Sequence, residues 1–172
     1  SNDMTGEIAR ALGAIVIRND RNMGKGYTLK RLFNEALKLG ADIIVALDAD
    51  GQHDPNYIPK LIEPIAKGQA DIAIGSRYQG VPPERIPLYR KIGLKIIGIF
   101  HKSVIKGVKD SQSGYRAYSR KVIEVLAKEL QEWGYGTETE QLYIAKKYGW
   151  RVIEVPVRIF YTVQNRSKKH PL

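Results

Sequence analysis

Residues 43–55 read Ile-Ile-Val-Ala-Leu-Asp-Ala-Asp-Gly-Gln-His-Asp-Pro, and this stretch decides the fold. A run of apolar residues ends abruptly in three aspartates, Asp48, Asp50 and Asp54. A short, bounded apolar run predicts a strand that is buried on both faces, as in parallel sheets. The aspartates then lie at the carboxyl end of the strand, which is where ligands bind in open α/β sheets.

Asp48 and Asp50 are two residues apart, so in extended backbone their side chains lie on the same side. Two carboxylates held this close repel each other unless a cation lies between them. Mg²⁺ and Mn²⁺ are natural candidates, because hard divalent ions take oxygen ligands and share them with phosphates. The alternative is a polar turn without a ligand. A calcium loop of the EF-hand type is excluded, because its glycine would have to come later than Gly51 and because Pro59 stands where the loop needs a glutamate.

The composition of the 172 residues predicts one domain with a hydrophobic core, spanning residues 1–172. There is no cysteine, which excludes disulfides and thiolate metal sites. The formal net charge of +10 indicates anionic partners such as nucleotides or phospholipid head groups. No apolar run approaches the roughly 20 residues that span a bilayer, and no secretory signal is visible.

The periodicity of apolar residues predicts alternating helices and strands in the first half of the chain. Leu29, Leu32, Phe33, Ala36 and Leu37 form the apolar face of one helix. This alternation predicts an α/β fold with a mostly parallel sheet and helices on both faces. The expected helices cover residues 3–12, 29–37, 55–65, 120–130 and 139–147, and the expected strands cover residues 14–18, 43–47, 71–75, 114–118 and 152–163.

Residues 90–106 mix apolar residues with four lysines, Lys91, Lys95, Lys102 and Lys106. This pattern is typical of a helix that packs on the core. It is equally typical of a basic amphipathic helix that lies on a membrane surface. The sequence leaves both interpretations open.

Two basic residues are expected at the same edge of the sheet as the aspartates. Lys25 stands at the start of a helix, where backbone N–H groups favour anions. Arg77 follows the strand over residues 71–75, and arginine suits bidentate phosphate contacts. Gly24-Lys25-Gly26 lacks the spacing of a Walker loop. His53 has no second histidine or cysteine at metal spacing, which argues against zinc.

Five blocks of the sequence together resemble the family 2 glycosyltransferases with the GT-A fold, and most closely the dolichol-phosphate mannose or glucose synthases. The blocks are Asn22–Gly26, Asp48–Pro55, Gly75–Tyr78, Asp110–Arg116 and Glu154–Val157. The resemblance implies transfer of a hexose from GDP-mannose or UDP-glucose to a polyprenyl or dolichyl phosphate, with inversion. It also implies Mg²⁺ or Mn²⁺ as cofactor, and a peripheral location on the cytoplasmic face of a membrane.

The resemblance also implies roles for individual residues. Asp48, Asp50 and Gln52 would hold the metal, and Asp48, Asp50 and Arg77 would act in catalysis. The donor side would comprise Lys25, Asp48, Ala49, Asp50 and Gln52, and the acceptor side Arg90, Ser113, Arg116 and Glu140.

The sequence departs from the family pattern at two places. It starts about where the second strand of the family ends, so we expect an N-terminally incomplete domain that lacks part of the nucleotide pocket. Thr162 stands where synthases of this group often carry an arginine. Two other functions stay open: a sugar-nucleotide nucleotidyltransferase, and a non-catalytic module that binds anionic membranes or nucleic acid.

Overall fold

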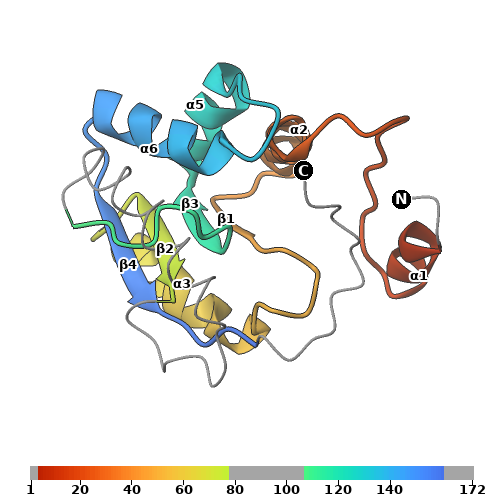
Figure 1. Cartoon of the computed structure of the whole chain (residues 1–172), viewed down its shortest axis with the longest axis horizontal. Helices are drawn as coiled ribbons and strands as arrows, with labels where there is room; N and C mark the ends of the chain where they lie inside the picture. The colour runs from red at the N-terminus through yellow and green to blue at the C-terminus, as the bar shows by residue number, and fades with distance from the viewer. Residues whose placement is uncertain (1–3, 78–106, 161–172) are drawn as a thin grey trace, which may run out of the picture.

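A computed structural model of the chain describes residues 4–77 and 107–160 (Figure 1). Short helices and strands alternate along most of the described chain. In order they are α1 (Thr5–Ala11), α2 (Lys25–Lys38), β1 (Ile43–Ala46), the 3₁₀ turn η1 (Pro55–Tyr57), α3 (Ile58–Ala66), β2 (Ile72–Ser76), β3 (Arg116–Ser119), α5 (Arg120–Glu129), α6 (Thr137–Lys147) and β4 (Val152–Pro156). None of these helices has the length and apolar character needed to span a bilayer.

The four described strands form one mixed sheet in the order β1-β3-β2-β4. Strand β3 is antiparallel to both β1 and β2, and β2 is parallel to β4. Strands β1, β2 and β4 therefore run in the same direction, and their carboxyl ends meet at one edge. Ala46 of β1 and Ile74 of β2 both pair with Arg116 of β3, so the residues that follow β1 and β2 leave the sheet on either side of Gly114.

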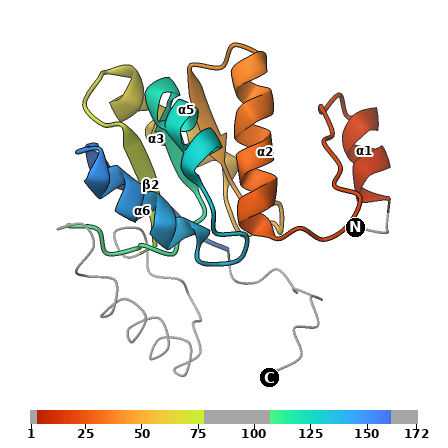
Figure 2. The same cartoon turned by 90° about the horizontal axis from the view of Figure 1, so that it is seen from above.

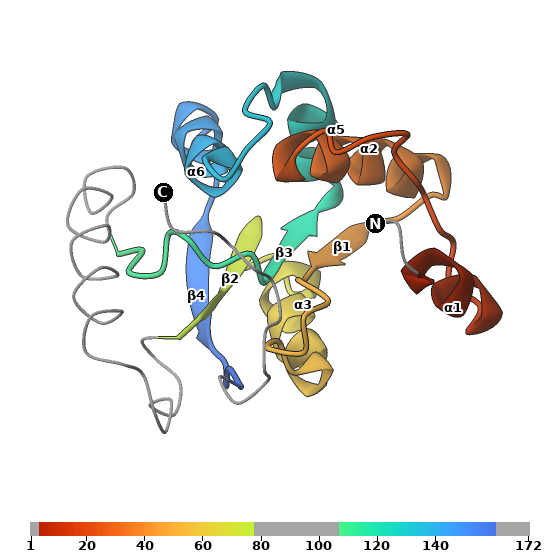
Figure 3. The same ribbon diagram turned by 45° about the vertical axis from the view of Figure 1, so that its right-hand side comes forward.

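Alternate residues of the strands enter two separate hydrophobic cores, as the period of two requires. Ile72, Ile74 and Tyr118 pack with α2, α5 and α6 on one face. Ala73 and Ala117 pack with α3 on the other face. Figure 3 shows α2, α5 and α6 above the sheet and α3 below it, and Figure 2 shows α2 beside α5. The predicted α/β class with helices on both faces is confirmed.

Three sequence-based expectations about strands were wrong. Strand β1 is only half-buried, because β3 is its single neighbour in the described sheet. Residues 14–18 form no strand, since no described strand lies beside them to supply hydrogen bonds. Strand β3 begins at Arg116 and is antiparallel, whereas residues 114–118 were expected to form a strand of a mostly parallel sheet. Asp54 caps η1, since its Oδ1 accepts the Asn56 N–H at 3.0 Å.

The first turn of α2 packs tightly against residues 131–133. The Gly26 N–H donates to the Trp133 carbonyl at 3.0 Å, and the Lys30 ammonium donates to the carbonyls of Lys128 and Leu130. A Cβ added at Gly26 would lie 1.8 Å from the Glu132 carbonyl oxygen, a contact that only backbone movement can relieve.

We therefore expect Gly26→Ala to lower the free energy of unfolding by about 2–3 kcal/mol, as overpacking does. Gly6→Ala is the matched control: it lies in α1, and its added Cβ meets only Val16 Cγ1, at 3.7 Å. That variant should be neutral or slightly more stable. The measurement is urea unfolding of both variants. Equal stability of the two variants would show that α2 does not dock on residues 131–133 as described.

Candidate functional site

Lys25, at the start of α2, is held by two carboxylates. Its Nζ lies 2.7 Å from Glu138 Oε1 and 3.1 Å from Asp48 Oδ1. Burial alone would lower the pKa of Lys25, but the hydrogen bond and charge of Glu138, with a smaller contribution from Asp48, raise the pKa above its ordinary value. The ammonium therefore stays charged at neutral pH and joins α2, the end of β1 and α6.

Because Gly114 has no side chain, Lys25 and Asp48 can come together beside its backbone. A Cβ at this position would lie 2.8 Å from Lys25 Nζ and 3.0 Å from Asp48 Oδ2. The ion pair thus packs directly against the backbone that precedes β3. A hollow of about 480 Å³ opens here, and Lys25, Asp48, Gly114 and Glu138 are among the residues that line it.

The aspartates lie in a turn after β1. Strand β1 ends at Ala46, and residues 49–52 form turns, so the alternation of an extended strand does not govern Asp48 and Asp50 as the sequence had suggested. Asp50 Oδ1 accepts the Gln52 N–H at 3.0 Å, which tightens the turn. Ala49 and Asp50 are exposed to solvent and Gln52 is half-buried.

His53 fixes the start of this turn. Its Nδ1 accepts the Asp48 N–H at 3.0 Å, and its ring stacks on Tyr115 with centroids 4.9 Å apart. Burial lowers the pKa of His53 below its ordinary value, which keeps the ring neutral and Nδ1 free to accept. The charges of Asp48, Asp50, Lys25 and Arg77 all act on this pKa, so the four predicted charged residues gather around one imidazole.

The donor set of the turn fits a divalent cation that is shared with phosphates. Asp48 and Asp50 offer carboxylate oxygens and Gln52 an amide oxygen, the ligands that Mg²⁺ and Mn²⁺ prefer. Within residues 4–77 and 107–160, no group of three or more His, Cys, Asp or Glu side chains forms a metal cage. A cation here would therefore take its remaining ligands from water or from a bound molecule, as Mg²⁺ commonly does.

Arg77 follows β2 and is paired with a buried acid. Its Nε lies 2.8 Å from Asp110 Oδ2, and its Nη2 bonds the other oxygen. Asp110 is buried, and its own N–H donates to Glu154 Oε1 on β4. The Asp110 carboxylate thus orients the Arg77 guanidinium, which was predicted to act in catalysis. Glu154 in turn holds the backbone of Asp110 in place.

Two residues predicted to contact the acceptor, Ser113 and Arg116, have buried side chains in the structure. Arg116 is fully buried, and its guanidinium donates to the carbonyls of Ser111, Ser113 and Glu138 and to Gln141 Oε1. The Ser113 hydroxyl is buried and donates to the Gly75 carbonyl at 2.7 Å. Both side chains shape the segment before β3 from within, because their polar groups are already used inside the protein.

Of the other two predicted acceptor residues, Glu140 belongs to the described part of the chain and Arg90 does not. Glu140 accepts the N–H groups of Gln131 and Glu132, each at 2.9 Å, and so caps the turn before α6. It also lines a second hollow of about 650 Å³ with Tyr135 and Tyr143. Arg90 lies outside the described residues, as do the expected amphipathic helix over 90–106 and Thr162.

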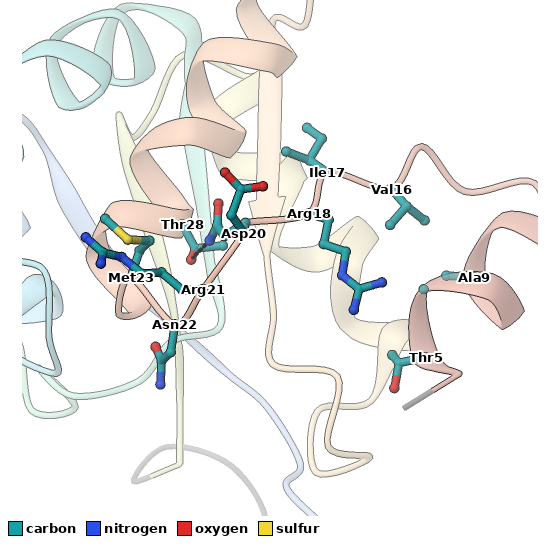
Figure 4. Close-up of a pocket in the computed structure, with 12 residues that line it drawn as sticks. Thr5, Ala9, Val16, Ile17, Arg18, Asp20, Arg21, Asn22, Met23 and Thr28 are labelled. Carbon is teal, nitrogen blue, oxygen red and sulfur yellow. Dashed lines mark hydrogen bonds between the residues drawn. The ribbon is translucent and has the colours of Figure 1, made fainter. Parts of the chain in front are cut away.

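A third hollow of about 830 Å³ lies between α1 and the segment before α2. In Figure 4, Arg18 lies between α1, which carries Thr5 and Ala9, and the loop with Asp20, Arg21 and Asn22. Asn22 and Thr28 line both this hollow and the one at Lys25, so the two adjoin. An elongated ligand could therefore extend from Asp48 along the start of α2 toward α1.

The model of the family described as Glycosyl transferase family 2 matches residues 1–127, about three quarters of the chain. The chain belongs to this family. The resemblance seen in the sequence is confirmed, and a glycosyltransferase is favoured over a nucleotidyltransferase or a module that only binds anions.

Curated relatives within glycosyltransferase family 2 are similar over most of the chain. A UDP-N-acetylglucosamine–dolichyl-phosphate N-acetylglucosaminyltransferase of Methanococcus voltae is 39% identical over 90% of this chain and 62% of its own length. A dolichol-phosphate mannosyltransferase of Pyrococcus furiosus is 39% identical over 98% of this chain and 48% of its own length. The chain thus spans about half to three fifths of these two relatives.

Solved structures of GT-A glycosyltransferases share the fold. Glucosyl-3-phosphoglycerate synthase from Mycobacterium tuberculosis in complex with UDP superposes with a TM-score of 0.65 at 22% identity, covering 92% of this chain and 57% of that one. The same enzyme has been solved with Mn²⁺ and UDP-glucose, with a TM-score of 0.61 and 21% identity. At this identity the likeness shows the fold alone.

The structure places three further residues at the candidate site to which sequence reasoning gave no role there. Glu138 was missed because the helix was expected to start at residue 139, whereas α6 starts at Thr137. His53 was considered only as a zinc ligand, and its packing on Tyr115 has no signal in the sequence. Gly114 belongs to a quoted block, but only its distance to Lys25 explains why glycine is needed there.

Proposed function

We propose that the protein transfers a hexose from a nucleoside-diphosphate sugar to a polyprenyl phosphate, with a divalent cation and with inversion at the sugar. The observation that carries the proposal is the turn Asp48–Gln52 beside the Lys25 ammonium, at the carboxyl edge of the sheet. The names of the two curated relatives, which specify dolichyl phosphate and dolichol phosphate, support the acceptor class.

The residues of this chain have distinct tasks in the proposed reaction. Asp48 and Asp50, with Gln52, hold the cation, and Lys25 offers a positive charge to the donor diphosphate. A bound Mg²⁺ or Mn²⁺ stabilises negative charge on the departing diphosphate. His53 keeps the turn in place by binding the Asp48 N–H. Positioning of donor and acceptor supplies much of the remaining rate enhancement.

The acceptor phosphate is the nucleophile in this proposal. One of its oxygens attacks the anomeric carbon, the carbon–oxygen bond to the diphosphate breaks, and the nucleoside diphosphate leaves with the electron pair. In-line attack inverts the anomeric centre. Because the phosphate is already an anion at neutral pH, the reaction needs no strong general base. Arg77 and Arg90 are proposed to face phosphate groups, and Glu140 to line the acceptor side.

A lipid acceptor implies contact with a membrane surface. We propose a peripheral location on the cytoplasmic face, which agrees with the net charge of +10, because anionic leaflets attract basic surfaces. The lysines between residues 90 and 106 are the candidates for this contact.

The test is sugar transfer by the protein at the full length that its gene encodes. UDP-N-acetylglucosamine, UDP-glucose and GDP-mannose are offered in separate reactions with dolichyl phosphate and Mg²⁺ or Mn²⁺. We expect one donor to give a glycosylated lipid whose formation stops with EDTA. Release of pyrophosphate from a nucleoside triphosphate, without any glycosylated lipid, would instead support a nucleotidyltransferase and refute the proposal.

A further inference from the structure

Glu138 is a buried carboxylate next to the proposed donor site. It lies in the first turn of α6, its side chain is 6% exposed, and its Oε1 lies 2.7 Å from Lys25 Nζ. The backbone around it is fixed, because the Glu138 carbonyl accepts a hydrogen bond from the buried Arg116 guanidinium. A buried charge of this kind is tolerated only with a close partner, and Lys25 supplies one.

Lys25 is at the same time the ammonium next to Asp48, at 3.1 Å. Asp48 is the more exposed of the two carboxylates, with 48% of its side chain exposed against 6% for Glu138. Glu138 therefore holds Lys25 in the pocket, while Asp48 faces the space in which a cation would bind. Lys25 stays paired with the Asp48 carboxylate as long as no other anion attracts its ammonium group.

We propose that Glu138 is a positioning residue that shares Lys25 with Asp48 and so limits how strongly Lys25 pairs with Asp48, and that Lys25 couples cation binding to diphosphate binding. Without a diphosphate, the ammonium competes with a divalent cation for the Asp48 carboxylate. When a diphosphate arrives, it attracts Lys25, and Asp48 is released to the cation. The inference rests on the proposed function, because it assumes that a diphosphate and a divalent cation bind here.

Because Lys25 is shared between Glu138 and Asp48, the direction of each change in Mn²⁺ affinity can be predicted. In Glu138→Gln the ammonium is left to Asp48 alone, so binding of Mn²⁺ without nucleotide should weaken by about threefold, in the range of a partly exposed ion pair. In Lys25→Met the competitor is gone, so Mn²⁺ should bind about threefold to fivefold more tightly. Because Glu138 acts through Lys25, Glu138→Gln should have no further effect in the Lys25→Met background.

The experiment is a double-mutant cycle measured by the electron paramagnetic resonance signal of free Mn²⁺, with no turnover involved. Wild type, Lys25→Met, Glu138→Gln and the double variant are titrated alone and with UDP or GDP. Lys38→Met and Glu35→Gln are matched controls, because they remove the same charges from an exposed pair at the far end of α2. We expect these controls to leave Mn²⁺ binding unchanged.

Two results separate the inference from the proposed function. If wild type binds no Mn²⁺ with either UDP or GDP, the proposed function fails and the inference fails with it. If wild type binds Mn²⁺ and nucleotide, but Glu138→Gln weakens Mn²⁺ equally in both backgrounds, Glu138 acts only through its own charge and the inference alone is wrong.

A second measurement applies if Lys25→Met does not fold, since that change leaves Glu138 buried without its lysine. Glu138→Gln keeps the shape of the side chain and removes the buried charge. In this variant the gain in Mn²⁺ affinity caused by UDP or GDP should be about threefold larger than in wild type. The reason is that Lys25 competes more strongly with Mn²⁺ for Asp48 in the variant, and a diphosphate removes that competition. An unchanged gain would overturn the inference.

Discussion

Asp50→Ala is expected to lower the rate of sugar transfer by about a hundredfold or more, the largest effect on activity that we predict. Asp50 contributes one of the two carboxylates of the turn after β1, and its Oδ1 also accepts the Gln52 N–H. Its loss removes a proposed cation ligand and also loosens the turn. The measurement is the initial rate of glycosylated lipid formation at saturating donor and Mn²⁺.

Asp42→Ala is the matched control for this variant. Asp42 precedes β1 at the opposite end of the strand, and its side chain is 88% exposed. Asp42→Ala removes the same charge next to the same strand and leaves the turn intact. The rate of sugar transfer by this variant should therefore stay within about twofold of wild type. If Asp50→Ala and Asp42→Ala retain equal activity, the turn does not hold a catalytic cation.

Arg116→Met should cause the largest loss of stability, about 3–5 kcal/mol in the free energy of unfolding. Arg116 is fully buried and donates to three carbonyls and one amide oxygen. Methionine fills part of the volume but leaves these acceptors without donors. Those acceptors belong to the segment before β3 and to α6, both of which border the site.

Urea unfolding checks this prediction, with Arg120→Met as control. Arg120 begins α5 and makes only partly exposed contacts with Glu124, Asp42 and the Ala41 carbonyl. Its loss should cost about 1 kcal/mol or less. A loss below about 1 kcal/mol for Arg116→Met would show that this arginine is not the buried support described here.

The sequence predicted the features that depend on local pattern. The apolar face of α2 follows from its spacing, and Phe33 is indeed fully buried, although Leu32 is 43% exposed beside the hollow at Lys25. The strand expected over residues 43–47 is also present, as β1 over Ile43–Ala46. These features are set by contacts between residues that are close in the chain.

The features that were missed depend on contacts between distant residues. The antiparallel insertion of β3 between β1 and β2 is a matter of topology, and a four-residue strand carries too little pattern to predict it. Arg116 was expected on the acceptor side because of the family resemblance, and its full burial was not foreseen, since arginine is almost never fully buried without partners. Its partners Ser111 and Gln141 come together only in the folded chain.

The most direct measurement is an anomalous diffraction map of crystals grown with Mn²⁺ and UDP or GDP. We expect a single manganese peak bonded to carboxylate oxygens of Asp48 and Asp50 and to the diphosphate, with Lys25 Nζ within hydrogen-bond distance of a phosphate oxygen. A nucleotide whose diphosphate and manganese lie away from the turn at residues 48–52 would contradict the site and the function proposed for it.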